Sequence, residues 1–249
     1  MNLITIIKWI NLKNTKTNCI IFPIANINEI LYNLNMSVRK IKKSYLSCTG
    51  YFASYKNNNQ IAFESVMERD LFMILEFDDS VLKYEEQPMQ VYYPYNDTTR
   101  RYTPDVLITY KDNSKKLIEV KYANELTKNK DLVEKIDILK NYFLNEHDLN
   151  FKLFTDEDID TQYLDNLKFL YKFVFIPIDK NKSDLINEIT LSNKEISIKN
   201  ILNTITSNRQ KQLEYIPYIW NYIFKNLNTL NINIKNKLTM ATTVNHIKA

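Results

Sequence analysis

The chain contains a single glycine, Gly50, among its 249 residues, and this scarcity limits the sites that it can build. Walker A loops, dinucleotide-binding turns and G-x-S-x-G nucleophile elbows each require several glycines close together. All three are therefore excluded. Asparagine tolerates left-handed backbone conformations better than most residues, so we expect it in turns where glycine would otherwise stand.

Histidine and cysteine are also scarce. His147 and His246 lie far apart in the chain, which excludes an H-E-x-x-H zinc site, and Cys19 and Cys48 do not form a C-x-x-C pair. If the protein is an enzyme, its chemistry must come from carboxylates and lysines. Two unpaired cysteines, with neither a long apolar run nor a secretory signal pattern, lead us to expect a cytoplasmic protein.

Charge divides the chain into three parts. Residues 1–60 carry 8 basic and 1 acidic side chain, residues 61–159 carry 13 and 21, and residues 160–249 carry 12 and 7. An acidic middle between basic ends is typical of a protein whose ends hold a polyanion and whose middle holds cations. Ordinary solvated surface with uneven lysine use gives the same pattern, so charge alone does not identify a partner.

Apolar periodicity in the acidic middle part predicts a fold with both helices and strands. Amphipathic helices are expected at 62–77 and 130–144. The second helix is long enough to connect two parallel strands, so we expect a mixed sheet flanked by helices. Branched and aromatic residues predict strands at 81–84, 89–93, 106–110, 117–121 and 151–154.

This arrangement places three charged side chains at one edge of the sheet. Glu119 and Lys121 alternate with Val120 and so project from one face, while Asp105 begins the neighbouring strand after Pro104. Mg²⁺ takes carboxylate ligands, polarises a bound phosphodiester and lowers the pKa of bound water. A nearby lysine stabilises the charge that develops on the phosphate. The pattern P-D-x(13)-E-x-K therefore predicts phosphodiester hydrolysis.

A third carboxylate would complete the ligand set. Glu64 and Glu68 lie four residues apart, on one face at the edge of the apolar stripe of the first helix, and either one suits the position. A bare E-x-K sequence also occurs in many strands as a solvated edge pair. The hypothesis therefore depends on the wider pattern of Pro-Asp, E-x-K and the two flanking helices.

The same part of the chain resembles a known family over about residues 60 to 170. Its motifs resemble those of the TnsA-type endonuclease subunit of heteromeric transposases, which belongs to the PD-(D/E)xK, restriction-endonuclease-like nucleases. The resemblance implies an α/β (α+β) nuclease core at 61–160, with a mixed sheet flanked by helices. The matching segments include Phe63-Glu64-Ser65-Val66-Met67-Glu68, Tyr84-Glu85-Glu86-Gln87-Pro88, Tyr102-Thr103-Pro104-Asp105 and Leu117-Ile118-Glu119-Val120-Lys121.

The resemblance also assigns roles to residues. It implies a catalytic lysine and a cluster of ligands for Mg²⁺, with Mn²⁺ able to substitute. The implied lysine is Lys121, and the implied ligands are Glu68 (not Glu64), Asp105, Glu119 and the main-chain carbonyl of Val120. Candidates for contact with DNA or for support of the site are Gln87, Arg100, Arg101, Lys42 and Lys43.

In that family the subunit cuts the 5′ strand at each transposon end. A DDE-type transposase cuts the 3′ strand and joins it to the target, and a regulatory ATPase is a further partner. The resemblance therefore implies double-stranded DNA as substrate and cut-and-paste transposition as the process. Two other hypotheses stay open, namely a stand-alone restriction, defence or junction-resolving nuclease, and a non-catalytic DNA-binding assembly module.

The two ends are less informative. We expect residues 1–60 to be a basic extension partly packed on the core, and residues 161–249 to be a smaller, mainly helical, winged-helix-like domain with a basic tail. Its helices are expected at 161–173, 196–205 and 212–224, the second opened by a capping box at 192–195.

Overall fold

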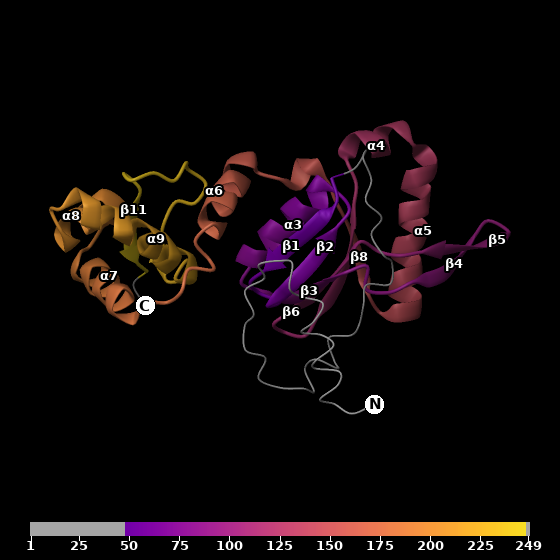
Figure 1. The fold of residues 1–249 in the computed structure, drawn as a ribbon. Helices are drawn as coiled ribbons and strands as arrows, with labels where there is room; N and C mark the ends of the chain where they lie inside the picture. Colours follow the sequence, from indigo (N-terminus) through magenta and orange to yellow (C-terminus); the bar gives the residue numbers. More distant parts are fainter. Residues whose placement is uncertain (1–47, 248–249) are drawn as a thin grey trace, which may run out of the picture. The chain divides into compact units, whose positions relative to one another are not determined.

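The computed structural model describes residues 48–247, and a four-stranded mixed sheet forms the centre of their first part (Figure 1). The first three strands in space pair antiparallel, and the last pair is parallel, as expected for strands joined by a helix. This arrangement confirms the predicted α/β class. In spatial order the strands are β3 (Val81–Glu86), β6 (Val106–Tyr110), β7 (Lys115–Val120) and β8 (Asn150–Phe154).

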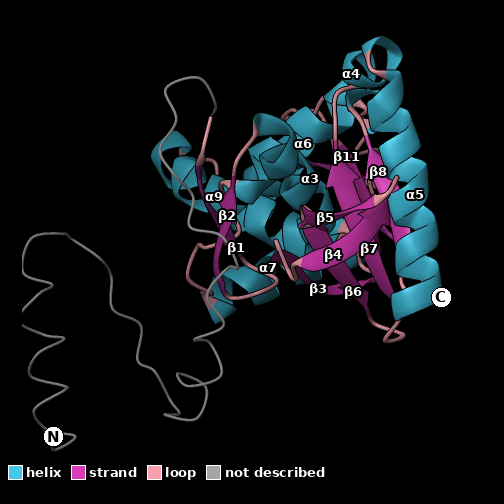
Figure 2. Cartoon of the chain, turned by 90° about the vertical axis from the view of Figure 1, so that its right-hand side faces the viewer, coloured by secondary structure: helices cyan, strands magenta, loops and turns pink. Residues whose placement is uncertain are grey.

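Both faces of this sheet are apolar and covered by a helix, because side chains alternate along each central strand. Val106 and Ile118 lie in the core beneath α3 (Val66–Phe77), whereas Leu117 lies in the core beneath α5 (Lys130–His147). Figures 1 and 2 show these two helices on opposite sides of the sheet. The result is a three-layer arrangement of helix, sheet and helix.

Side-chain hydrogen bonds mark where these helices begin. The hydroxyl of Ser65 accepts from the amide of Glu68, so α3 starts at Val66 and not at 62 as the apolar pattern predicts. The side chain of Asn129 caps α5 in the same way, after the short α4 (Ala123–Lys128). Periodicity alone did not separate the helix from the apolar strand before it.

Two hairpins pack onto this core, where the sequence predicts only one strand, at 89–93. The first contributes Phe52 and Ile61 to the core beneath α3, and the second contributes Tyr93 to the core beneath α5. The boundary expected between 60 and 61 falls inside the first hairpin. The hairpins consist of β1 (Gly50–Ser54) with β2 (Asn59–Phe63), and β4 (Val91–Tyr95) with β5 (Thr98–Tyr102).

Turns in this protein are built without glycine. Asn58, Asn96 and Asn113 adopt positive φ angles of 50°, 45° and 66°, as expected for residues that replace glycine in left-handed turns. Gly50 instead lies in a strand, where a Cβ atom would stand 2.7 Å from the ring of Phe63. Close approach, not turn formation, is therefore what the single glycine provides.

The C-terminal part forms a second core around a small three-stranded sheet. Ile198, Ile201, Trp220 and Val244 are buried in this core. The structure adds a helix and three short strands that the sequence did not predict. The expected capping box at 192–195 is wrong, because Ser197 caps the helix that follows. The elements are α6 (Thr161–Tyr171), α7 (Lys180–Ser192), β9 (Ile196–Ser197), α8 (Ile198–Ile205), α9 (Arg209–Lys225), β10 (Leu230–Asn231) and β11 (Thr243–His246), after a 3₁₀ turn at Asp156–Asp158.

The three short strands of this part lie in the order β10-β11-β9, with both pairs antiparallel. Its winged-helix-like character stays a prediction, as do the domain limits at 60/61 and 160/161. Within residues 48–247, no helix has the length and apolar character needed to cross a membrane.

Helix α6 contributes to both cores. Leu164 and Leu167 lie in the core of the large sheet, whereas Leu170 lies in the C-terminal core. The hydroxyl of Tyr171 donates to the carbonyl of Ala53 at 2.6 Å and its oxygen accepts from the amide of Tyr55 at 3.0 Å. This helix is thus fixed to the first hairpin by polar contacts as well as by apolar packing.

A buried carboxylate, Glu76, fixes the first hairpin to the rest of the core. One of its oxygens accepts from the hydroxyls of Ser54 and Tyr84, and the other accepts from the amides of Tyr55 and Lys56 at 3.1 and 3.0 Å. Four donors from β1, the following turn and β3 therefore converge on one side chain of α3.

Replacing Glu76 with alanine is expected to lower the free energy of unfolding by about 2–4 kcal/mol, because two buried hydroxyls and two partly buried amides lose their acceptor. Urea denaturation followed by circular dichroism measures this change. The exposed Glu146 of α5 provides the control, since Glu146→Ala should change the free energy by less than about 0.5 kcal/mol. Equal midpoints for the two variants would contradict a structural role for Glu76.

Candidate active site

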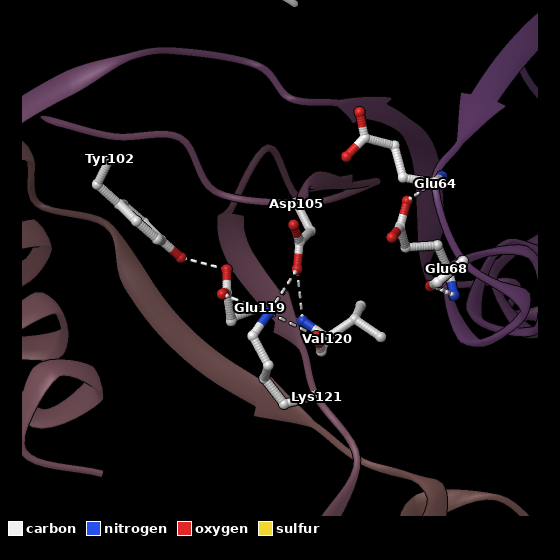
Figure 3. Close-up of polar contacts among 8 residues, drawn as sticks. Glu64, Glu68, Tyr102, Asp105, Glu119, Val120 and Lys121 are labelled. Carbon is white, nitrogen blue, oxygen red and sulfur yellow. Dashed lines mark hydrogen bonds and ion pairs between the residues drawn. The ribbon is translucent and has the colours of Figure 1, made fainter. Parts of the chain in front are cut away.

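Asp105 immediately precedes β6, and two hydrogen bonds fix it at the edge of the large sheet (Figure 3). The main-chain carbonyl of Asp105 accepts a hydrogen bond from the amide of Gln87 at 2.8 Å, and its carboxylate Oδ2 accepts from the amide of Val120 at 2.8 Å. The first bond fixes the backbone and the second directs the side chain toward the end of β7. Asp105 therefore lies beside the E-x-K segment, as the spacing predicts.

Glu119 is the second carboxylate at this edge, and it is only 5% exposed. The hydroxyl of Tyr102 donates to its Oε2, and the ammonium of Lys121 lies 2.8 Å from its Oε1 (Figure 3). Glu119 is buried because it follows Leu117 on the face that α5 covers. A carboxylate in this position is held on both oxygens.

Three oxygen atoms surround the ammonium group of Lys121. Its Nζ lies 2.8 Å from Oε1 of Glu119, 2.9 Å from the carbonyl oxygen of Val120 and 3.9 Å from Oδ2 of Asp105. The amide of Lys121 donates to the carbonyl of Phe154 in the neighbouring strand at 3.0 Å, which fixes the backbone here. The oxygens expected to bind a metal ion thus converge on one positive charge.

Burial and a neighbouring negative charge disfavour the ionised form of Asp105. Burial raises the pKa of Asp105 above its usual range, and the nearby negative charge of Glu119 raises it further. Burial alone would lower the pKa of Lys121, but Glu119 and Asp105 outweigh that effect, so the pKa is raised and the lysine stays charged. Two carboxylates thus share one counter-charge.

Glu68, the expected helix carboxylate, lies apart from this cluster. Its Oε2 accepts from the amide of Glu64 at 2.8 Å, and Figure 3 shows both glutamates on one side of Asp105. Burial raises the pKa of Glu68, and its charge in turn raises the pKa of Asp105. Glu68 thereby caps the start of α3, and residues 48–247 contain no group of three acidic, histidine or cysteine side chains arranged to hold a metal ion.

The remaining candidates differ in how close they lie to the site. Gln87 is buried, has a φ of 43°, and its Oε1 has no hydrogen-bond partner in the described part of the chain. Arg100 and Arg101 are exposed on β5, and the guanidinium of Arg100 lies 4.1 Å from the ring centre of Tyr95. Lys42 and Lys43 lie outside the described residues.

Tyr102 is a residue of the site that the sequence patterns did not predict. Burial and the charge of Glu119 raise the pKa of its hydroxyl, so this group remains a donor. The available signal was its place three residues before Asp105, as the one aromatic residue at the end of a polar segment. Its contact with Glu119 depends on the second hairpin, which the sequence patterns did not predict.

A mixed sheet covered by helices on both faces agrees with the restriction-endonuclease-like fold that the sequence predicts. Residues 78–156 match the family described as TnsA-like endonuclease N terminal. The match confirms the resemblance to TnsA-type nucleases over these residues. It includes Asp105, Glu119 and Lys121 but not Glu68. No curated protein matches the chain.

Replacing Lys121 with methionine tests whether the ammonium balances the two carboxylates. In the presence of a chelator we expect the free energy of unfolding to fall by about 1–3 kcal/mol, which is below the value for a fully buried pair because Lys121 is partly exposed. Adding Glu119→Gln to this variant should restore part of the loss. Chemical denaturation measures both changes.

The matched control is Lys152→Met, which changes an exposed lysine on β8 and should leave stability nearly unchanged. A Lys121→Met variant as stable as this control would show that the carboxylates need no counter-charge.

Proposed function

We propose that this protein is a metal-dependent DNA endonuclease that hydrolyses phosphodiester bonds and cuts the 5′ strand at transposon ends. One observation carries the proposal. Within a TnsA-like endonuclease domain, oxygens of Asp105, Glu119 and Val120 surround the single ammonium of Lys121. Such a cluster suits a reaction in which cations must hold a polyanionic substrate.

The donor set fits a hard divalent cation. Two carboxylates and one carbonyl supply only oxygen atoms, which Mg²⁺ and Mn²⁺ accept. Burial raises the pKa of Asp105, and the negative charge of Glu119, which one lysine does not balance, raises it further. Asp105, Glu119 and the carbonyl of Val120 would hold the ion, and Glu68 would join them on exchanging its hydrogen bond with Glu64. The bound ion would polarise the scissile phosphate and lower the pKa of a bound water.

Lys121 acts as a cation in this scheme and not as a base. Burial alone would lower the pKa of Lys121, but the charges of Glu119 and Asp105 raise it, so without a bound metal ion the amine is protonated and has no lone pair to take a proton from water. One of its N–H groups would instead donate to a phosphate oxygen and stabilise the negative charge that grows there as the bond to the nucleophile forms. Asp105 and Glu119 position this ammonium before the substrate binds.

The partners follow from the family and from what the chain lacks. We propose double-stranded DNA at transposon ends as the substrate, with a DDE-type transposase that cuts the other strand. A chain with one glycine cannot form a Walker A loop, so ATP use in such a system requires a separate regulatory ATPase. The basic residues of the two ends of the chain suit contact with the DNA backbone.

Asp105→Asn is expected to abolish DNA cleavage, because the amide keeps the shape of the side chain but not the charge that holds the cation. The assay uses DNA carrying transposon ends, Mg²⁺ or Mn²⁺ and the DDE-type transposase proposed as partner. We expect a loss of at least about 100-fold, comparable to removal of a group that stabilises the transition state. Glu146→Gln, the same change at an exposed position, should cleave like wild type. Undiminished cleavage by Asp105→Asn would refute the assignment.

Omitting the transposase separates transposition from stand-alone nuclease activity. We expect 5′-strand cuts at the transposon ends only when both proteins are present, because no base-recognition motif is visible in this chain. Sequencing of the cut ends gives the strand and the position. Strong cleavage by this protein alone would favour a restriction, defence or junction-resolving nuclease. Calorimetry without any Mg²⁺ or Mn²⁺ binding would favour a non-catalytic assembly module.

A further inference from the structure

We propose that Tyr102 is a positioning residue, whose hydroxyl holds the Glu119 carboxylate in the orientation that binds the metal ion. The inference rests on the proposed function, and it assigns to the second hairpin a part in building the site. Tyr102 reaches Glu119 from the last residue of β5, an element outside the sheet that carries Asp105 and Glu119.

The two carboxylate oxygens of Glu119 have different partners. Oε2 accepts the Tyr102 hydroxyl, and Oε1 faces Lys121 and the oxygens around it (Figure 3). Tyr102 is 7% exposed and Glu119 is 5% exposed, so little water competes for this hydrogen bond. A carboxylate with one oxygen fixed in this way presents the other in one direction. Hydrogen bonds of this kind orient metal-binding carboxylates and tune their affinity.

Packing fixes the position of the ring that carries the hydroxyl. The ring of Tyr102 lies 6.1 Å from that of Phe143 on α5 and 6.2 Å from that of Phe151 on β8, centre to centre. The ammonium of Lys135 lies 5.0 Å from the centre of the same ring. Helix α5 and strand β8 thus hold the tyrosine from two sides, and its hydroxyl is a fixed donor.

A second tyrosine of the same hairpin, Tyr93, is buried in the core but does not contact Glu119. Its ring lies 6.2 Å from that of Tyr102 in the same core. Within residues 48–247 its hydroxyl forms no hydrogen bond with another side chain or with the backbone. The two residues therefore share a hairpin, a core and a residue type, but only Tyr102 contacts Glu119.

The test compares Mn²⁺ binding by the full-length wild-type, Tyr102→Phe and Tyr93→Phe proteins, measured by titration calorimetry. Loss of a hydrogen bond to a ligating side chain typically lowers metal affinity about 10- to 100-fold, so we expect that loss for Tyr102→Phe and none for Tyr93→Phe. In cleavage assays the Mn²⁺ concentration for half-maximal rate should rise for Tyr102→Phe, with the rate at saturating Mn²⁺ largely recovered. Wild-type affinity in Tyr102→Phe would overturn the inference.

A double-mutant cycle separates positioning from a general effect on the core. Glu119→Asp keeps the charge but withdraws the carboxylate from the hydroxyl, so adding Tyr102→Phe to it should cause no further loss of Mn²⁺ affinity. Additive losses would overturn the inference. Should Tyr102→Phe fail to fold, wild-type Mn²⁺ affinity in Glu119→Asp alone would do so. Failure of the wild-type protein to bind Mn²⁺ would instead refute the proposed function.

Discussion

Alternation of side chains along β6 and β7 is the constraint on which the rest of the structure depends. It gives the sheet two apolar faces, one beneath α3 and one beneath α5, and it decides which charged groups meet at the edge. Glu119 belongs to the face beneath α5 and is buried there beside Tyr102, whereas Val120 belongs to the face beneath α3 and offers only its main chain to the site. A shift of one residue in the pairing of these strands would exchange the two sets.

The site is arranged at the expense of local stability. Two carboxylates that share one ammonium at a poorly hydrated edge are an unfavourable group, as the raised pKa of Asp105 shows. The amide of Val120, the hydroxyl of Tyr102 and the ammonium of Lys121 hold these carboxylates in place. Oxygens fixed in advance need little rearrangement when a cation or a phosphate arrives, and this is the advantage of such a strained arrangement.

Sequence patterns predicted the central strands of the large sheet more completely than the two hairpins that pack on it. Branched residues at 106–110 gave the limits of β6, and the spacing from Asp105 to Glu119 placed both at one edge. The two hairpins were not predicted, because their strands are short and one, at 98–102, is mostly polar. The position of the Glu68 carboxylate depends on a local competition between capping α3 and facing the site, which spacing does not resolve.

The leucines of α6 have a consequence for how this protein unfolds. One helix supplies side chains to the core of the large sheet and to the C-terminal core, and Tyr171 at its end is bonded to the first hairpin. Neither core is complete without it, so the two are joined into one cooperative unit. Truncation at residue 160 would remove Leu164 and Leu167 from the core of the large sheet, together with the ring of Tyr171 that stacks on Phe52. The large sheet therefore cannot be separated from residues 161–171 without loss of part of its core.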